Sequence, residues 1–87
     1  MPAAVKKISS NDCIADAARR ILAARSIHRP IANSDDLREA GMTSLDMVNL
    51  VLAVESAFDL EIPESMITPA NFRSVASIDA LIARLTN

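Results

Sequence analysis

The sequence has few of the residues that disulfides, sharp turns and β-sheets require. Its 87 residues include one cysteine, one histidine, one glycine and two phenylalanines, and no tryptophan or tyrosine. One cysteine cannot form an internal disulfide, and one cysteine with one histidine cannot supply a zinc site of thiolates and imidazoles, so we expect no metal. The shortage of aromatic residues, beside many Ala, Leu and Ile, disfavours strands. It favours one small all-α domain of packed helices.

The sequence also lacks a strong net charge and long apolar runs. Nine basic and eleven acidic side chains give a net charge of −2. The chain therefore lacks the excess of basic residues that is typical of nucleic-acid-binding proteins. No run reaches the roughly 18 uninterrupted apolar residues of a membrane span, and the pair Lys6-Lys7 precedes no apolar signal-peptide core. We expect a cytoplasmic monomer whose partners are proteins, and neither nucleic acid nor a membrane.

The spacing of apolar residues predicts a first helix and then a long loop. Residues 1–10 show no clear period and are expected to be a flexible lead-in to a single domain over residues 11–87. Asn11 or Asp12 offers a helix cap. The apolar residues that follow recur at helical intervals: Ile14, Ala17, Ala18, Ile21 and Leu22. Residues 26–43 keep no helical period, and we expect this loop to lie across the bundle with four apolar residues tucked in: Ile27, Ile31, Leu37 and Met42.

Three more helices are expected after the loop. The first and longest spans residues 44 to about 58. Thr68 as a cap and Pro69 at the first helical position predict a short helix, which Phe72 anchors in the core. Ser74 caps a last helix with an apolar stripe of Val75, Ile78, Leu81, Ile82 and Leu85. The expected fold is a four-helix bundle of three longer helices and one short helix, with the long loop between the first two.

The helix over residues 44–58 carries its apolar residues in two groups, at roughly 100° per residue. A broad face is sufficient for the core: Met47, Leu50, Val51, Ala53, Val54, Ala57 and Phe58. We expect burial of Phe58, Val54, Ile78 and Leu81 in particular. A second, narrow group, here called the apolar stripe, consists of Leu45, Val48 and Leu52 and lies among polar residues: Asp46, Asn49, Glu55, Ser56 and Asp59. Either the long loop covers this stripe, or the stripe is an exposed docking surface.

Gly41 and Ser44 precede and open this helix. Gly41 can take the positive φ that a sharp turn needs, and a serine just before periodic apolar residues is a favoured N-cap. The positive end of a helix also favours a phosphate ester on the same hydroxyl. The residues by themselves leave both interpretations of Ser44 open, a simple cap or a modified serine.

The order Ser44-Leu45-Asp46, followed by Phe58, Ile62 and Pro63, resembles an acyl carrier protein. In that family the serine of an Asp-Ser-Leu-type motif opens the second helix and carries 4′-phosphopantetheine. The resemblance covers nearly the whole chain. It implies that a phosphopantetheinyl transferase attaches this cofactor, taken from coenzyme A, to Ser44. Fatty-acid carriers usually have Asp before the serine, whereas this chain has Thr43, which leaves the identity of the partners open.

The resemblance implies a carrier and not an enzyme. An acyl group would be held as a thioester on the thiol of the 4′-phosphopantetheine arm. The carrier would present it to acyl-processing enzymes of fatty-acid, polyketide or related acyl metabolism. An alternative is a dedicated aminoacyl or peptidyl carrier, loaded by an amino acid:carrier protein ligase. Two further alternatives are of other classes: a helical protein-interaction module without a prosthetic group, and a small enzyme that uses Cys13 and His28.

Partner enzymes of the resembled family recognise the helix that the serine opens. The resemblance implies a docking surface of eight residues: Thr43, Leu45, Asp46, Val48, Asn49, Leu52, Glu55 and Ile62. Ile62 would also help line a groove for the arm or its cargo. Asn49 and Ser56 stand where acids are common in the family. Docking is therefore expected to depend more on apolar contact than on long-range charge.

Overall fold

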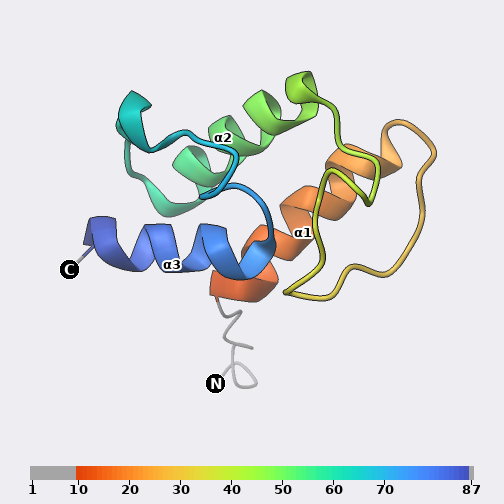
Figure 1. Cartoon of the computed structure of the whole chain (residues 1–87), viewed down its shortest axis with the longest axis horizontal. Coiled ribbons are helices and arrows are strands. Elements are labelled where there is room, and N and C mark those ends of the chain that lie inside the picture. Colours follow the sequence, from red (N-terminus) through yellow and green to blue (C-terminus); the bar gives the residue numbers. More distant parts are fainter. Residues whose placement is uncertain (1–9, 87) are drawn as a thin grey trace, which may run out of the picture.

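The computed structural model describes residues 10–86, in which three α-helices follow one another along the chain. They are α1 (Ser10–Ala23), α2 (Ser44–Phe58) and α3 (Val75–Thr86), with a short 3-10 helix η1 (Glu64–Met66) before α3 (Figure 1). This range contains no strand, so the all-α expectation is confirmed. No helix in it is long and apolar enough to cross a membrane. The expected lead-in over residues 1–10 lies outside the described residues except for Ser10, which opens α1.

α1 is the helix on which the other two pack. It contacts both α2 and α3, whereas the backbones of α2 and α3 do not approach each other within the described part of the chain. Figure 1 shows the segment between η1 and α3 running between these two helices. The largest fully buried side chains come from the three helices and from the loop between α1 and α2: Ile14, Leu22, Leu37, Leu50, Val54, Val75, Ile78 and Leu81. These side chains belong to one hydrophobic core that joins the three helices and the loop. Each contributes about 1.5–3 kcal/mol by leaving water.

The chain between α1 and α2 is not helical and lies across the bundle as expected. Leu37 and Met42 are buried, and Ile27 and Ile31 pack half-buried against the core. Two backbone hydrogen bonds tie this loop to the start of α3: Leu37 N–H donates to the Arg73 carbonyl at 2.8 Å, and Ala76 N–H to the Asn33 carbonyl at 2.9 Å. These contacts hold the loop in place up to the residue where α2 begins.

The prediction of a short helix that begins at Thr68-Pro69 is wrong. The structure has a single turn there, in which Thr68 Oγ1 accepts from Asn71 N–H at 3.2 Å and the Thr68 carbonyl from Phe72 N–H at 3.1 Å. The turn cannot continue, because Ser74 caps the next helix: its Oγ accepts from Ser77 N–H at 3.1 Å. Over residues 10–86 the bundle thus has three α-helices and the 3-10 turn η1. The expected roles of Phe72 as a core anchor and of Ser74 as a cap are confirmed.

The prediction that Phe58 is buried also needs correction. Val54, Ile78 and Leu81 are fully buried as expected, but Phe58 is half-buried at the edge of the core. α2 ends at Phe58 because the next residue, Asp59, adopts the left-handed conformation (φ 52°) and turns the chain away. The side chain therefore covers the core at the end of the helix. Its truncation should cost less than the roughly 3–5 kcal/mol of a fully buried phenylalanine.

Candidate functional site

Thr43, and not Ser44, caps α2. Thr43 Oγ1 accepts from Asp46 N–H at 3.2 Å, while Asp46 Oδ2 accepts from Thr43 N–H at 3.0 Å. This reciprocal pair is a capping box. Ser44 is consequently the first residue inside the helix; its side chain is exposed and hydrogen-bonds to no other described residue. The capping box corrects the interpretation of Ser44 as a cap and leaves its hydroxyl free to react.

Asp46 belongs to the interior of this site and not to its surface. Arg25 Nη1 lies 2.6 Å from Asp46 Oδ2 and also donates to the Gly41 carbonyl at 3.1 Å. Only 6% of Asp46 is exposed. The hydrogen bond from Thr43 N–H, and then the bond and charge of Arg25, hold the pKa of this carboxyl below its ordinary value of 3.8, against the opposing effect of burial. Asp46 is thus charged, paired and enclosed, which removes it from the predicted docking surface.

Gly41 makes the turn that leads into the capping box. Its φ of +121° is a conformation that side-chain-bearing residues rarely adopt. A Cβ there would also stand 2.9 Å from Ile27 Cδ1, a half-buried side chain of the long loop. Together with the contact from Arg25 to the Gly41 carbonyl, this tight packing sets the direction from which the chain enters α2.

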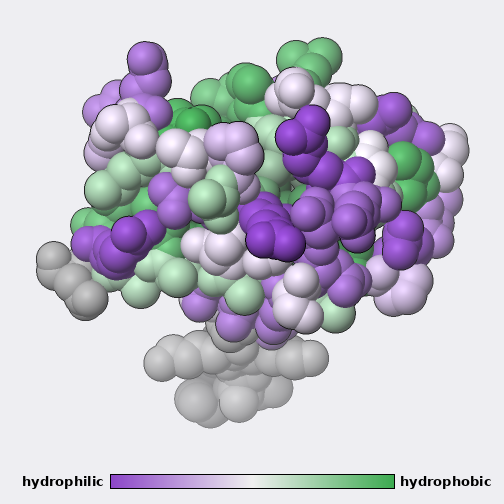
Figure 2. All heavy atoms as spheres, in the orientation of Figure 1, coloured by the Kyte–Doolittle hydropathy of each residue, from purple (hydrophilic) through white to green (hydrophobic). Residues whose placement is uncertain are grey.

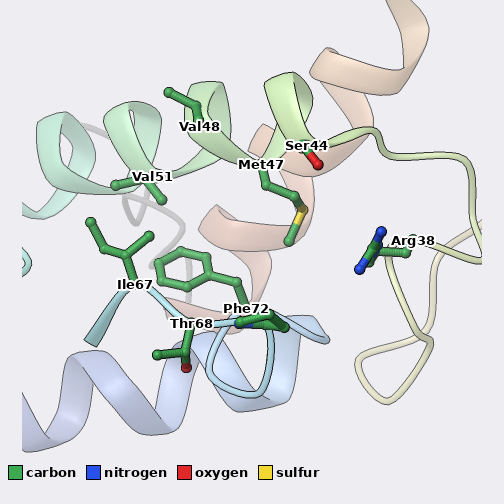
Figure 3. A pocket seen from close by; sticks show the side chains of 9 residues that line it. Arg38, Ser44, Met47, Val48, Val51, Ile67, Thr68 and Phe72 are labelled. Carbon is green, nitrogen blue, oxygen red and sulfur yellow. The ribbon is translucent and has the colours of Figure 1, made fainter. Parts of the chain in front are cut away.

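A groove of about 270 Å³ begins at Ser44 and runs between α2 and the segment before α3. Figure 3 shows Met47 and Val51 on one wall, facing Ile67 and Phe72 on the other. Val48, Thr68 and Pro69 complete the apolar part of the lining, and Arg38 of the long loop stands at the Ser44 end. The groove thus offers an apolar surface directly beside a free hydroxyl.

Ile62 does not line this groove, which is a further correction. It is buried, and its N–H donates to Glu55 Oε2 at 2.8 Å, toward the far end of α2. Ile67, 41% exposed, lines the groove instead, beside Val51 at the end away from Ser44 (Figure 3). The half-buried Glu55 and the buried Ile62 line a neighbouring hollow with Pro63 and Ile67, and their role in docking stays a prediction. Sequence reasoning missed Ile67 and Arg38 because both lie in irregular segments without a period.

The apolar stripe is exposed along α2. Leu45 is 69%, Val48 53% and Leu52 57% exposed. This exposure excludes the alternative in which the long loop covers the stripe, and hydrogen bonds tie that loop to the start of α3. Thr43 and Asn49 are exposed beside the stripe. In Figure 2 apolar atoms lie along the upper edge of the molecule, where Figure 1 places α2.

Cys13 and His28 do not form a catalytic pair. His28 lies in a hollow with Arg19 and Leu22 of the later turns of α1. Cys13 is on that helix at least six residues earlier, about 9 Å along the axis at 1.5 Å per residue. Among the described residues, no three His, Cys, Asp or Glu side chains gather as a metal site requires.

Comparison with known proteins identifies the family. Residues 14–85 match the sequence family described as "Phosphopantetheine attachment site". The chain belongs to the phosphopantetheine-binding carrier proteins. The cofactor of this carrier protein is 4′-phosphopantetheine. The groove and the exposed, unbonded hydroxyl of Ser44 at its end fit such a group.

The relatives of this carrier protein include aminoacyl carriers. It is 42% identical over 62 residues to "Aminoacyl carrier protein 1" of Bradyrhizobium diazoefficiens, covering 71% of this chain and 69% of that protein. "Aminoacyl carrier protein 2" of the same organism is 39% identical over 64 residues, covering 74% and 72%.

Two solved structures are similar to the carrier protein in fold. One is a chain of the crystal structure of Bradyrhizobium japonicum glycine:[carrier protein] ligase complexed with glycylated carrier protein, with TM-score 0.77, 36% identity and coverage of 83% of this chain and 96% of that chain. The other, of the ligase with its cognate carrier protein and an analogue of glycyl adenylate, has TM-score 0.79, 35% identity and coverage of 86% and 96%.

Proposed function

We propose that this chain is an aminoacyl carrier protein whose prosthetic group is attached to Ser44. The observation that carries the proposal is the free hydroxyl of Ser44, which the capping box of Thr43 and Asp46 leaves exposed beside the groove. The names of the two Bradyrhizobium relatives favour aminoacyl cargo over the fatty-acyl or polyketide cargo that the family suggests by default. The chain would hold its cargo and leave the chemistry to partner enzymes.

Attachment would use the Ser44 oxygen as a nucleophile toward coenzyme A. A bond forms between Ser44 Oγ and the phosphorus that carries the pantetheine, and the bond from that phosphorus to the bridging pyrophosphate oxygen breaks. The 3′,5′-adenosine bisphosphate leaves, and the hydroxyl proton passes to a base of the transferase or to water. The transferase supplies the divalent metal that neutralises the phosphates. The aminoacyl group is later held as a thioester on the thiol of the attached arm.

Partner enzymes would dock on α2 through a smaller set of residues than the resemblance implies. Leu45, Val48 and Leu52 form an exposed apolar row, with the polar side chains of Thr43 and Asn49 beside it. Such a patch with a polar rim is typical of a protein-interaction site. One partner class is the transferase, and the other is an amino acid:carrier protein ligase, as in the complexes of the two similar structures.

Intact mass spectrometry tests attachment. The purified chain is incubated with coenzyme A and a broad-specificity phosphopantetheinyl transferase. The expected result is a gain of one phosphopantetheine group, which Ser44→Ala abolishes and Ser56→Ala, at another exposed serine of α2, does not. Modification of the Ser44→Ala protein would refute the site. Absence of modification in every variant would support the alternative of a helical interaction module.

The cargo is tested on the modified protein. It is incubated with ATP and an amino acid:carrier protein ligase, with a panel of amino acids and, in parallel, with an acyl carrier protein synthetase and fatty acids. A mass gain with an amino acid and the ligase, and none with the fatty acids, supports the proposal. Mass gain only with fatty acids would return the chain to the fatty-acyl class.

A further inference from the structure

Arg38 is an arginine without a partner at the Ser44 end of the groove. Its backbone is well held: Arg38 N–H donates to Asp36 Oδ1 at 2.8 Å, and the Arg38 carbonyl accepts from Gly41 N–H at 3.1 Å. Its guanidinium, in contrast, makes no hydrogen bond or ion pair with any described residue. The side chain is therefore a free positive charge on an anchored backbone.

The position of this charge relates it to the serine. Arg38 and Ser44 line the same groove. Figure 3 shows the guanidinium nitrogens of Arg38 on the groove side of the loop, facing the end of α2 to which the Ser44 oxygen is attached. The loop thus places a group with several N–H donors across from the hydroxyl.

Two acids near the ends of this loop, Asp36 and Asp46, are already paired with other groups. Asp36 Oδ2 lies 3.6 Å from Arg73 Nε, and its other oxygen accepts from the backbone of the same turn. Asp46 is enclosed with Arg25. No acid is among the residues that line the groove, so Arg38 is the one charged side chain of its lining.

We propose that Arg38 binds the phosphodiester that joins Ser44 to the pantetheine arm. This inference rests on the proposed attachment at Ser44. A phosphodiester carries one negative charge on two free oxygens, which the planar fork of a guanidinium can bind together. Because the diester is covalently fixed to Ser44, it would remain at a high effective concentration beside Arg38. The contact would direct the first atoms of the arm toward the groove between Met47 and Phe72.

The chain offers a matched control. Arg19, on α1, is also an exposed arginine without a partner among the described residues, and it lines a different hollow beside His28. Arg19→Gln and Arg38→Gln remove the same charge. Arg38→Lys keeps the charge and removes the fork. Both arginines are exposed, so the melting temperature of each of the three variants should stay near that of the wild type.

The test uses the ³¹P resonance of the phosphodiester and the Nε–H resonances of the arginines. We expect the Arg38 Nε–H resonance to move between the unmodified and the modified protein, while that of Arg19 does not. Arg38→Gln should shift the ³¹P resonance, Arg38→Lys should shift it less, and Arg19→Gln should leave it unchanged. Salt should move the wild-type ³¹P resonance toward the Arg38→Gln value, because an exposed ion pair is screened. Transfer from coenzyme A should slow about two- to fivefold in Arg38→Gln, the range for an exposed pair.

Each contrary result has a definite meaning. If the ³¹P resonance of fully modified Arg38→Gln equals that of the wild type, Arg38 does not bind the diester and the inference is wrong. If loading by the ligase then slows in this variant, the arginine contacts the partner enzyme instead, which also refutes the inference. If the wild-type protein gains no phosphopantetheine mass, the proposed attachment itself fails and this inference fails with it.

Discussion

Arg25 and Asp46 connect the chain just beyond α1 to the first turn of α2, through a 2.6 Å contact between Nη1 and Oδ2. The same guanidinium holds the Gly41 carbonyl, so one arginine binds the chain on both sides of Ser44. The contact also pairs the acid that directly follows Ser44-Leu45. The start of α2 therefore exposes Leu45 and Val48 and encloses Asp46, the acid that the resemblance placed on the docking surface.

The first prediction separates the cap from the modified residue. Ser44→Ala should change the free energy of unfolding by less than about 0.5 kcal/mol, because Ser44 is exposed and the cap is on Thr43. Thr43→Ala should cost about 1 kcal/mol, the usual value for a lost N-cap. Urea unfolding of both variants makes the comparison. A larger loss in Ser44→Ala would mean that the serine hydroxyl supports the helix after all.

The second prediction concerns acid. The pKa of Asp46 is lower in the folded chain than its ordinary value of 3.8, so the folded state favours the charged form. The resulting stabilisation is fully present above pH 3.8 and is lost as the pH falls through the lower, folded-state pKa. Asp46→Asn should therefore flatten the pH dependence of the melting temperature below about pH 4. Asp16→Asn, which removes a half-exposed carboxylate of α1 that lies 3.0 Å from Arg20, is the matched control for the loss of one negative charge.

The third prediction tests the apolar stripe. Val48→Asp and Leu52→Asp should change stability by no more than about 0.5 kcal/mol, because both side chains are more than half exposed. Either change should slow loading by the transferase or ligase, since it places an unpaired charge in an apolar contact. Ala80→Asp, at an exposed position of α3, adds the same charge away from the stripe and should load normally. Equal loading rates for all three would exclude α2 as the docking helix.

The fourth prediction concerns the turn before the serine. Gly41→Ala should destabilise the fold by about 1–3 kcal/mol, because the added Cβ forces a residue into a φ that it rarely adopts and meets Ile27 Cδ1 at 2.9 Å. Chemical denaturation measures this loss. Combining the change with Ile27→Val should recover only the part due to the contact. Full recovery in the double variant would show that crowding, and not the backbone angle, makes glycine necessary.

The sequence alone determined the elements whose cause is local. Apolar spacing of three and four residues specifies α1, α2 and α3 without reference to the rest of the chain, and Ser74 caps α3 by a bond to a residue three positions later. The sequence also separated Leu45, Val48 and Leu52 from the core face of α2, but it left open whether the long loop covers them, and the tertiary structure shows them exposed. The resemblance carried by Ser44-Leu45-Asp46 and Phe58 added the cofactor.

Tertiary structure decided the features that depend on residues far apart in the chain. Asp46 looks like a surface acid of α2 until Arg25, 21 residues earlier, encloses it. Ile67, and not Ile62, lines the groove. The irregular segment before α3 places Ile67 beside Val51, whereas Ile62 is buried and its N–H donates to Glu55. Arg38 comes to the Ser44 end of the same groove through the path of a loop that has no period of its own. Periodicity reports the direction of a side chain relative to its own helix axis, whereas these contacts are set by how separate segments pack together.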